Sequence, residues 1–218
     1  MTFSIVGRCE RTGQLGVAIS SSSIAVGARC PWVRAGVGVV STQNITLPAL
    51  GPRVLDLLEQ GADPQAALRQ ALDDGSWPQY RQVTVVDAQG RTGVFSGGQA
   101  LGIFTSAVGR QCVAAGNLLA SERTIEAMVP AFERSADLPL AERLLAAMQA
   151  AMAAGGEAGP VHSAALKVAG EHSWPMADLR VDWSEHDPIG ALQGLWAAYA
   201  PQMQDYQTRA IDPRAAPS

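Results

Sequence analysis

The chain starts with Met1 and Thr2, and these two residues offer its most distinctive chemistry. Bacterial-type methionine aminopeptidases remove an initiator methionine when the next side chain is small, as threonine is. Removal leaves Thr2 with a hydroxyl and a free α-amino group. A threonine hydroxyl is a poor nucleophile until a base takes its proton. An α-amino group, with an ordinary pKa of about 7.7–8.0, can accept that proton directly or through one water molecule.

Short polar side chains lie at the ends of predicted strands, where they could surround Thr2. They include the serines of 20–23, the run 41–44, and Asn117, which follows a glycine. Such side chains can hold an amine, donate to an oxyanion or bind a substrate amide. Four are selected: Asn44 and Asn117 as catalytic residues, and Gln43 and Ser22 as substrate-binding residues. Turn formation and strand capping remain the alternative for each.

The basic residues are fifteen arginines and a single lysine, Lys167. Lysine is the usual alternative base in amide-hydrolysing sites, but Lys167 is far along the chain from Thr2. Arg34 stays protonated and cannot act as a base. It could instead lower the pKa of the Thr2 amine or orient a substrate carboxylate, and an ordinary surface position is its alternative.

The sequence motifs give little support to nucleotide binding, metal binding or redox chemistry. The stretch 36–41 lacks the last glycine of the dinucleotide-binding pattern, and no phosphate-binding GxxxxGK[ST] motif occurs. The three histidines, His162, His172 and His186, are scattered, and the three cysteines have no CxxC spacing. We therefore expect no cofactor, no metal site and three reduced thiols.

Composition narrows the class of protein further. A net charge of −4 and a pI near 5.3 provide no basic face for nucleic acid. No apolar run approaches the roughly 20 residues that a membrane span needs, so we expect a soluble, cytoplasmic protein. Apolar residues make up 47% and charged residues 17% of the chain, which favours a homo-oligomer, with a homodimer as the simplest case. The length favours one domain over 1–200, followed by a loosely structured tail over 201–218.

Apolar runs and turn signals predict the order of the elements. Strands are expected over 2–8, 15–23, 35–46, 81–87, 92–97, 100–108, 111–117, 161–170 and 176–182. Helices are expected over 51–60, over 64–72 with Asp63 as N-cap, over 121–134, from Asp137 to Gly155, and over 187–199. Because several strands are apolar on both faces, both sides of each sheet need a cover. The order predicts an α+β protein with antiparallel sheets between two helical layers.

Seven ordered blocks resemble one bacterial family. They are TFSIVGR (2–8), SSSIAVGARCPWVRAGVGVVSTQ (21–43), RQVTVVDAQGR (81–91), AAGNLL (114–119), PLAERLLAAM (139–148), HSAALKV (162–168) and LRVD (179–182). From Thr2 to about Leu195, the chain is similar to the family catalogued as domain of unknown function 1028, which is grouped with the Ntn (N-terminal nucleophile) hydrolases.

The resemblance implies a four-layer αββα sandwich and amide hydrolysis at the first residue of the processed chain. In this comparison Glu157 stands for an acid that family members carry, and His162 replaces a glutamine before Ser163. His162 is taken as a fourth substrate-binding candidate beside Gln43, Ser22 and Arg34. It either adds a group that titrates near neutral pH or is a strand residue with a satisfied ring.

The sequence therefore favours an Ntn-type amidohydrolase that cleaves a small amide or peptide-like bond. Thr2, exposed by removal of Met1, would form an acyl-enzyme. The alternative is a catalytically silent Ntn-fold protein that serves as a ligand-binding or structural subunit.

Overall fold

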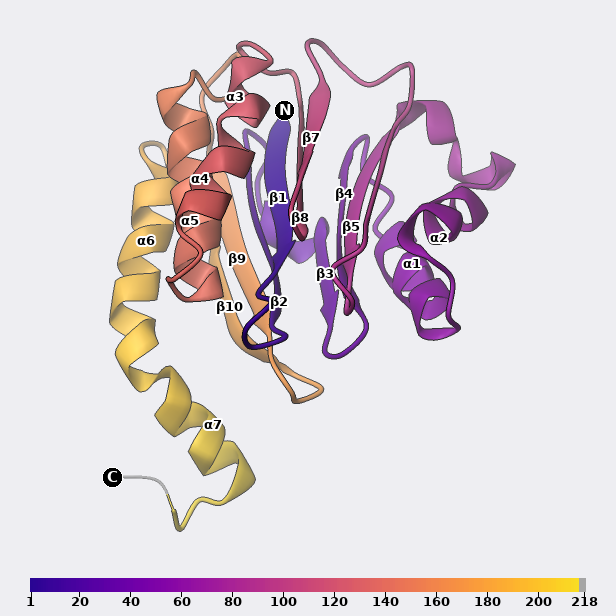
Figure 1. Cartoon of the computed structure of the whole chain (residues 1–218). Coiled ribbons are helices and arrows are strands. Elements are labelled where there is room, and N and C mark those ends of the chain that lie inside the picture. Colours follow the sequence, from indigo (N-terminus) through magenta and orange to yellow (C-terminus); the bar gives the residue numbers. More distant parts are fainter. Residues whose placement is uncertain (216–218) are drawn as a thin grey trace.

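Two antiparallel sheets pack face to face between two helical layers in the computed structural model, which describes residues 1–215 (Figure 1). The larger sheet has the strand order β10-β9-β2-β1-β8-β7, and the smaller has the order β3-β4-β5-β6. The predicted four-layer αββα sandwich is confirmed for this part of the chain.

The larger sheet places β1 near its middle. Its strands are β1 (Thr2–Arg8), β2 (Leu15–Ser21), β7 (Thr105–Gly109), β8 (Cys112–Asn117), β9 (Ser163–Ala169) and β10 (Pro175–Val181). Its outer face is covered by α3 (Arg123–Glu126), α4 (Met128–Arg134), α5 (Leu140–Ala153) and α6 (Pro188–Tyr199). Leu140, Leu144, Leu145 and Met148 of α5 are buried because this helix lies against β1, β2 and β9, whereas Met152 on the last turn is exposed.

The smaller sheet is covered by the first helix pair. Its strands are β3 (Pro31–Arg34), β4 (Gly38–Asn44), β5 (Arg81–Asp87) and β6 (Thr92–Ser96), and its helices are α1 (Leu50–Glu59) and α2 (Pro64–Ala71). Short 3₁₀ turns lie at η1 (Val26–Ala28), η2 (Asp74–Ser76), η3 (Pro78–Tyr80) and η4 (Ala200–Gln202).

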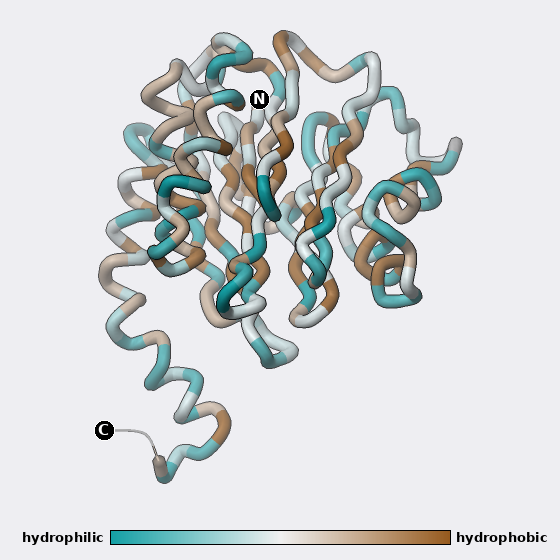
Figure 2. The backbone as a smooth tube through the Cα atoms, in the orientation of Figure 1, coloured by the Kyte–Doolittle hydropathy of each residue, from teal (hydrophilic) through white to brown (hydrophobic). Residues whose placement is uncertain are grey.

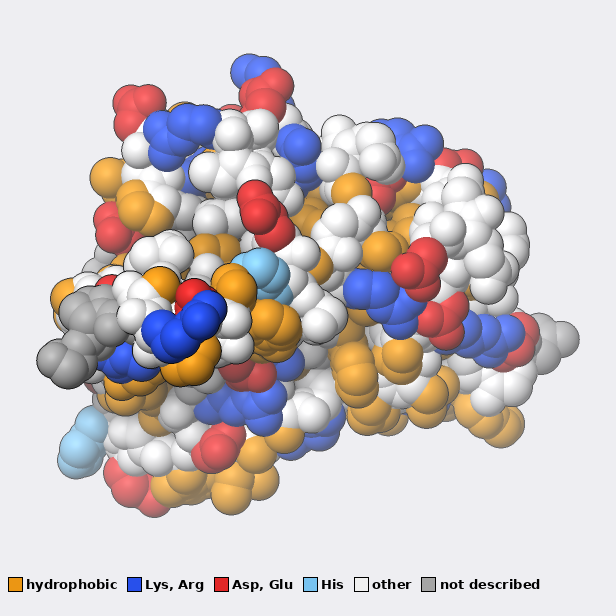
Figure 3. Space-filling view, turned by 90° about the horizontal axis from the view of Figure 1, so that it is seen from below, with side chains coloured by type: hydrophobic (Ala, Val, Ile, Leu, Met, Phe, Trp, Pro, Cys, Tyr) orange, Lys and Arg blue, Asp and Glu red, His pale blue; other side chains and the backbone are white. Residues whose placement is uncertain are grey.

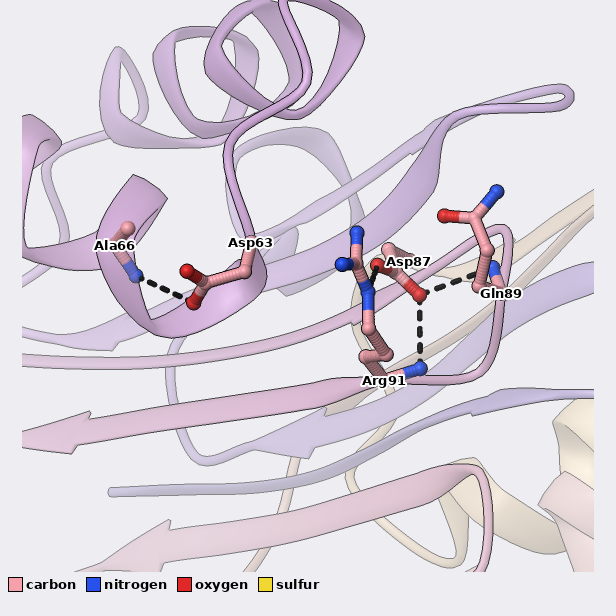
Figure 4. A network of polar contacts seen from close by, with 5 residues as sticks. All are labelled: Asp63, Ala66, Asp87, Gln89 and Arg91. Atoms are coloured by element: carbon pink, nitrogen blue, oxygen red, sulfur yellow. Dashed lines mark hydrogen bonds and ion pairs between the residues drawn. The ribbon is translucent and has the colours of Figure 1, made fainter.

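Two aspartates fix local geometry in this half of the molecule (Figure 4). Asp63 caps α2, as predicted, by accepting a hydrogen bond from the Ala66 amide at 3.0 Å. Asp87 accepts from the backbone amides of Gln89 and Arg91 and from the Arg91 guanidinium, which closes the turn between β5 and β6. These bonds stabilise the turn over 87–91.

Some elements differ from the sequence-based expectation. The strand β3 has no counterpart among the predicted strands. The strand predicted over 100–108 is shifted to Thr105–Gly109, and the helix predicted over 121–134 is divided between α3 and α4. The tail predicted over 201–218 contains a helix, α7 (Met203–Ile211). Tyr206 stacks on Tyr199 with ring centroids 5.8 Å apart, a contact that composition does not reveal. Residues 216–218 lie outside the described residues.

Apolar residues follow the strands of both sheets, and hydrophilic residues gather at the turns between them (Figure 2). The packing between the two sheets is apolar around Val6, Val17, Val39, Val86 and Val113. Within residues 1–215, no helix is long and apolar enough to cross a membrane.

Candidate active site

Thr2 begins β1, which lies between β2 and β8. It pairs with Ser21 on β2 and with Asn117 on β8. Side chains alternate along a strand, so Thr2 shares a face with Ser4 and Val6. Since Val6 packs against the valines of the smaller sheet, this face is directed between the sheets. The Thr2 side chain is therefore held between the two sheets, and the residue is only 6% exposed.

The hydroxyls of Thr2 and Ser21 form a pair. Their oxygens are 3.2 Å apart, and each donates to the carbonyl oxygen of Met1 at 2.5 Å. The backbone amide of Ser23 donates to Ser21 Oγ at 3.1 Å, which fixes the orientation of that hydroxyl. One carbonyl oxygen thus receives two hydroxyl donors at the point where the chain begins.

Buried amide side chains connect the two sheets beside this pair. Gln43 Oε1 accepts from Ser4 Oγ at 2.7 Å, and Gln43 Nε2 donates to Gln82 Oε1 at 2.8 Å. Gln82 Oε1 also accepts from Asn117 Nδ2 at 3.1 Å, while Gln82 Nε2 donates to the Gly116 carbonyl at 3.1 Å. We call Ser4, Gln43, Gln82 and Asn117 the inter-sheet polar network. Each hydrogen bond supports the next, so the network holds Asn117 opposite Thr2.

Glu157 is a buried carboxylate near the amino terminus. Its Oε2 accepts from the Ser22 amide at 3.2 Å, and its Oε1 is buried with no hydrogen-bond partner among the described residues. Burial raises the pKa of Glu157 to about 8, although the positive α-amino group of Met1 and the hydrogen bonds from Ser22 offset part of that effect. A carboxyl group with this pKa is largely neutral at pH 7.

Ser22 and His162 contact site residues through their backbone amides. The Ser22 amide contacts Glu157, and the His162 amide donates to the Ser21 carbonyl at 2.9 Å. The His162 ring is engaged elsewhere, because Nδ1 lies 2.9 Å from the Ser184 carbonyl oxygen and the ring stacks on Trp183 at 4.3 Å.

Arg34 and Asn44 are not brought to Thr2. Arg34 pairs with Gly38 at the opposite end of β4 from Gln43, and its guanidinium forms ion pairs of 2.8 Å with Asp56 and with Glu59 on α1. Asn44 lies on the other face of β4 from Gln43 by strand alternation. Its side chain donates to the Tyr80 carbonyl and accepts from the Leu101 amide, so it holds loops together.

Ser21 and Gln82 are site residues that the sequence analysis did not select. The alternation of side chains along a strand could have identified both residues. Ser21 lies on the same strand face as Val17, and Gln82 on the same face as Val86. Both valines face the space between the sheets. Within the residues that the structure describes, no three His, Cys, Asp or Glu side chains come together to hold a metal ion.

Two antiparallel sheets packed face to face between helical layers define the fold, and Thr2 begins a central strand of the larger sheet. The chain belongs to the Family of unknown function (DUF1028), whose model matches residues 2–192. No curated protein matches the chain.

Solved structures that resemble this chain include a member of the same family. Protein SPO2555 from Silicibacter pomeroyi, of family DUF1028, is 32% identical, with a TM-score of 0.83 over 91% of this chain and 89% of that chain. Anbu (ancestral beta-subunit) from Yersinia bercovieri matches at 12% identity and a TM-score of 0.43, over 92% and 96% of the two chains. The Anbu (Gly-1) mutant from Hyphomicrobium sp. strain MC1 matches at 12% identity and a TM-score of 0.37, over 93% and 96%.

The inter-sheet polar network predicts a large effect of Gln82→Leu. The substitution removes Gln82 Oε1, the acceptor of Asn117 Nδ2 and of one N–H of Gln43, whose Nε2 keeps its bond to the Ala115 carbonyl, and it leaves the Gly116 carbonyl without its side-chain donor. Each unpaired buried group costs about 1–3 kcal/mol, so we expect the free energy of unfolding to fall by about 2–5 kcal/mol in urea titrations. The same substitution at exposed Gln70 on α2 is the control, with a change within about 0.5 kcal/mol. Equal effects at the two positions would show that the network does not stabilise the fold.

Burial of Glu157 predicts a pH-dependent stability difference. The ordinary pKa of 4.5 applies to the unfolded chain and about 8 to the folded chain, so between these values the folded state binds more protons. The contribution of Glu157 to stability is therefore present below about pH 4.5 and is lost as the pH rises toward 8. We expect Glu157→Gln to gain stability relative to wild type by ~1 kcal/mol per pH unit over this interval.

Thermal and urea unfolding at pH 5, 6, 7 and 8 measure this difference. Glu126→Gln, the same change at an exposed position on α3, controls for the loss of one charge. A difference between wild type and Glu157→Gln that stays constant or shrinks with rising pH would contradict the prediction.

Proposed function

We propose that the chain, once Met1 has been removed, is an Ntn-type amidohydrolase that cleaves a small amide or peptide-like bond. The observation that carries this proposal is the placement of Thr2. Met1 precedes it, its hydroxyl lies between the sheets, and Ser21 and Asn117 flank it in register. Removal of Met1 would give this hydroxyl an adjacent α-amino group.

Thr2 supplies both the nucleophile and the base in this mechanism. Its α-amino group takes the proton of the hydroxyl while Oγ1 attacks the carbonyl carbon of the substrate amide. The proton then passes to the leaving amine, and the acyl group remains on Oγ1 as an ester. A water molecule, deprotonated by the same amine, hydrolyses the ester and restores the Thr2 hydroxyl.

The Met1 carbonyl oxygen indicates where a substrate oxygen would be stabilised. Ser21 Oγ donates to it at 2.5 Å, and after Met1 has left the same hydroxyl is available to an oxyanion. One such donor contributes roughly a hundred- to thousandfold in rate. Asn117, opposite Thr2, is the second polar wall residue, and Gln43 and Gln82 hold it in place.

The neutral state of the Glu157 carboxyl group is compatible with the Thr2 amine acting as a base. A charged carboxylate beside the amine would favour the protonated ammonium form, which cannot accept a proton. Because burial keeps Glu157 largely neutral at pH 7, the amine keeps its basic form more readily. Ser22 orients Glu157 through its amide, and His162 lies beside Ser21, which places both at the edge of the proposed substrate site.

A silent ligand-binding or structural subunit is the second candidate, and the state of Thr2 with Met1 attached favours it. In that state the hydroxyls of Thr2 and Ser21 both donate to the Met1 carbonyl, and the Thr2 nitrogen is part of an amide and cannot act as a base.

We also propose a homo-oligomer, supported by the low share of charged residues and by the exposed side chains of Trp77, Leu101 and Ile103.

Variants of Thr2 test the enzyme proposal. Protein whose intact mass lacks methionine is screened against a panel of small amides. Thr2→Val keeps the size of the side chain and permits removal of Met1, but it has no hydroxyl. We expect it to lose roughly a thousandfold of the turnover, and Thr2→Ser to keep measurable activity. Turnover that survives in Thr2→Val would exclude Thr2 as the nucleophile.

A further inference from the structure

A cavity lies at the other end of β1 from Thr2. It has a volume of about 550 Å³ and includes Arg8, Arg11, Arg110 and Arg143 in its wall. Six residue steps of roughly 3.3 Å separate Thr2 from Arg8, so the cavity is about 20 Å from the proposed nucleophile. Figure 3 views this end of the molecule and shows arginine and acidic side chains side by side on it.

Arg143 is a buried cation in the wall of this cavity. The residue is only 7% exposed, and its Nε donates to the Phe132 carbonyl at 3.3 Å. Its guanidinium carbon lies 3.9 Å from the centre of the Phe132 ring. No carboxylate lies within ion-pair distance of Arg143 among residues 1–215. A buried charge without a counter-ion is costly, so the site favours an anion.

The location of Arg143 on its helix adds to this positive potential. It lies in the first turn of α5, whose N-cap residue, Pro139, provides no side-chain acceptor for the helix amides. The amino terminus of a helix carries a partial positive charge. Both the helix dipole and the guanidinium therefore attract an anion to the same wall.

Arg8 faces the same cavity with an unsatisfied donor. Its Nη1 donates to Gln111 Oε1 at 2.6 Å, whereas its Nε is buried and has no partner in the described part of the chain. A guanidinium presents its donors in a fixed fork that matches the oxygens of a carboxylate or a phosphate. Arg8 and Arg143 are thus two cations without carboxylate partners in one cavity.

The acidic residues of the wall are largely engaged with other groups. Glu10 pairs with Arg110 Nη2 at 2.6 Å, and Glu133 Oε1 accepts from the Arg110 backbone amide at 2.8 Å. Asp137 is the third acidic residue; Arg11 Nη2 donates to its backbone carbonyl oxygen at 3.3 Å, so this contact leaves the Asp137 carboxylate as an acidic group of the wall. Four arginines against three acidic residues leave the wall with a net positive charge.

We infer that this cavity binds a small anionic metabolite bearing a carboxylate or phosphate group, with Arg8 and Arg143 as its ligands. The volume accommodates a molecule larger than a single inorganic ion. The site is separate from Thr2, so binding there does not require the proposed hydrolase activity. Binding to the folded state stabilises that state in proportion to the logarithm of ligand concentration.

Calorimetric titration of the full-length protein with citrate and with inorganic phosphate tests the inference. Ionic strength is held constant with sodium chloride, and the two anions separate carboxylate from phosphate recognition. We expect saturable binding of at least one of them. Arg8→Gln and Arg143→Gln should weaken it at least tenfold, and Arg143→Lys should restore part of the affinity.

Two controls identify the site. Arg53→Gln removes an exposed arginine that pairs with Asp73, and it should bind as wild type does. Thr2→Val should also bind normally, which separates this cavity from the proposed active site. If Arg143→Gln fails to fold, Arg8→Gln decides the outcome. The inference is overturned if neither anion binds saturably, if Arg8→Gln binds as tightly as wild type, or if Thr2→Val abolishes binding.

Discussion

The burial of β1 on both faces is the constraint on which the site depends. Strands β2 and β8 hold its backbone on either side, helices cover one face, and the smaller sheet covers the other. Strand alternation then decides the direction of every side chain. Phe3 and Ile5 enter the helix-facing core, while Thr2 and Ser4 face the other sheet. Pairing slipped by one residue would bury the Thr2 hydroxyl among apolar groups.

This constraint divides the space between the sheets into an apolar half and a polar half. The valines fill one half, and the inter-sheet polar network fills the half next to Thr2. Buried amides are tolerated only when their donors and acceptors are paired, and Gln43 and Gln82 each make several bonds across the sheets. The network thereby orders Asn117 through neutral amide and hydroxyl groups.

The architecture and the position of Thr2 could be predicted from the sequence because they depend on local signals. Apolar runs, turn residues and the Asp63 cap define the order of elements. Contacts between the sheets could not be predicted in the same way, since one strand does not reveal which strand lies opposite it. Gln82 was missed for this reason.

Arg34 was expected near Thr2, but antiparallel pairing with Gly38 places it at the far end of the sheet. Ser21, and not Ser22, shares the strand face of Val17, so alternation along β2 favours Ser21 for the space between the sheets.

Covalent labelling tests the central claim, that Thr2 is a nucleophile once Met1 is removed. Processed protein is treated with a β-lactone that acylates nucleophilic hydroxyls, and the adduct is located by peptide mass spectrometry. The account predicts one acyl group on the amino-terminal peptide, on the Thr2 oxygen, and none on protein that retains Met1. An unlabelled amino-terminal peptide from fully processed protein, or an adduct elsewhere in the chain, would contradict it.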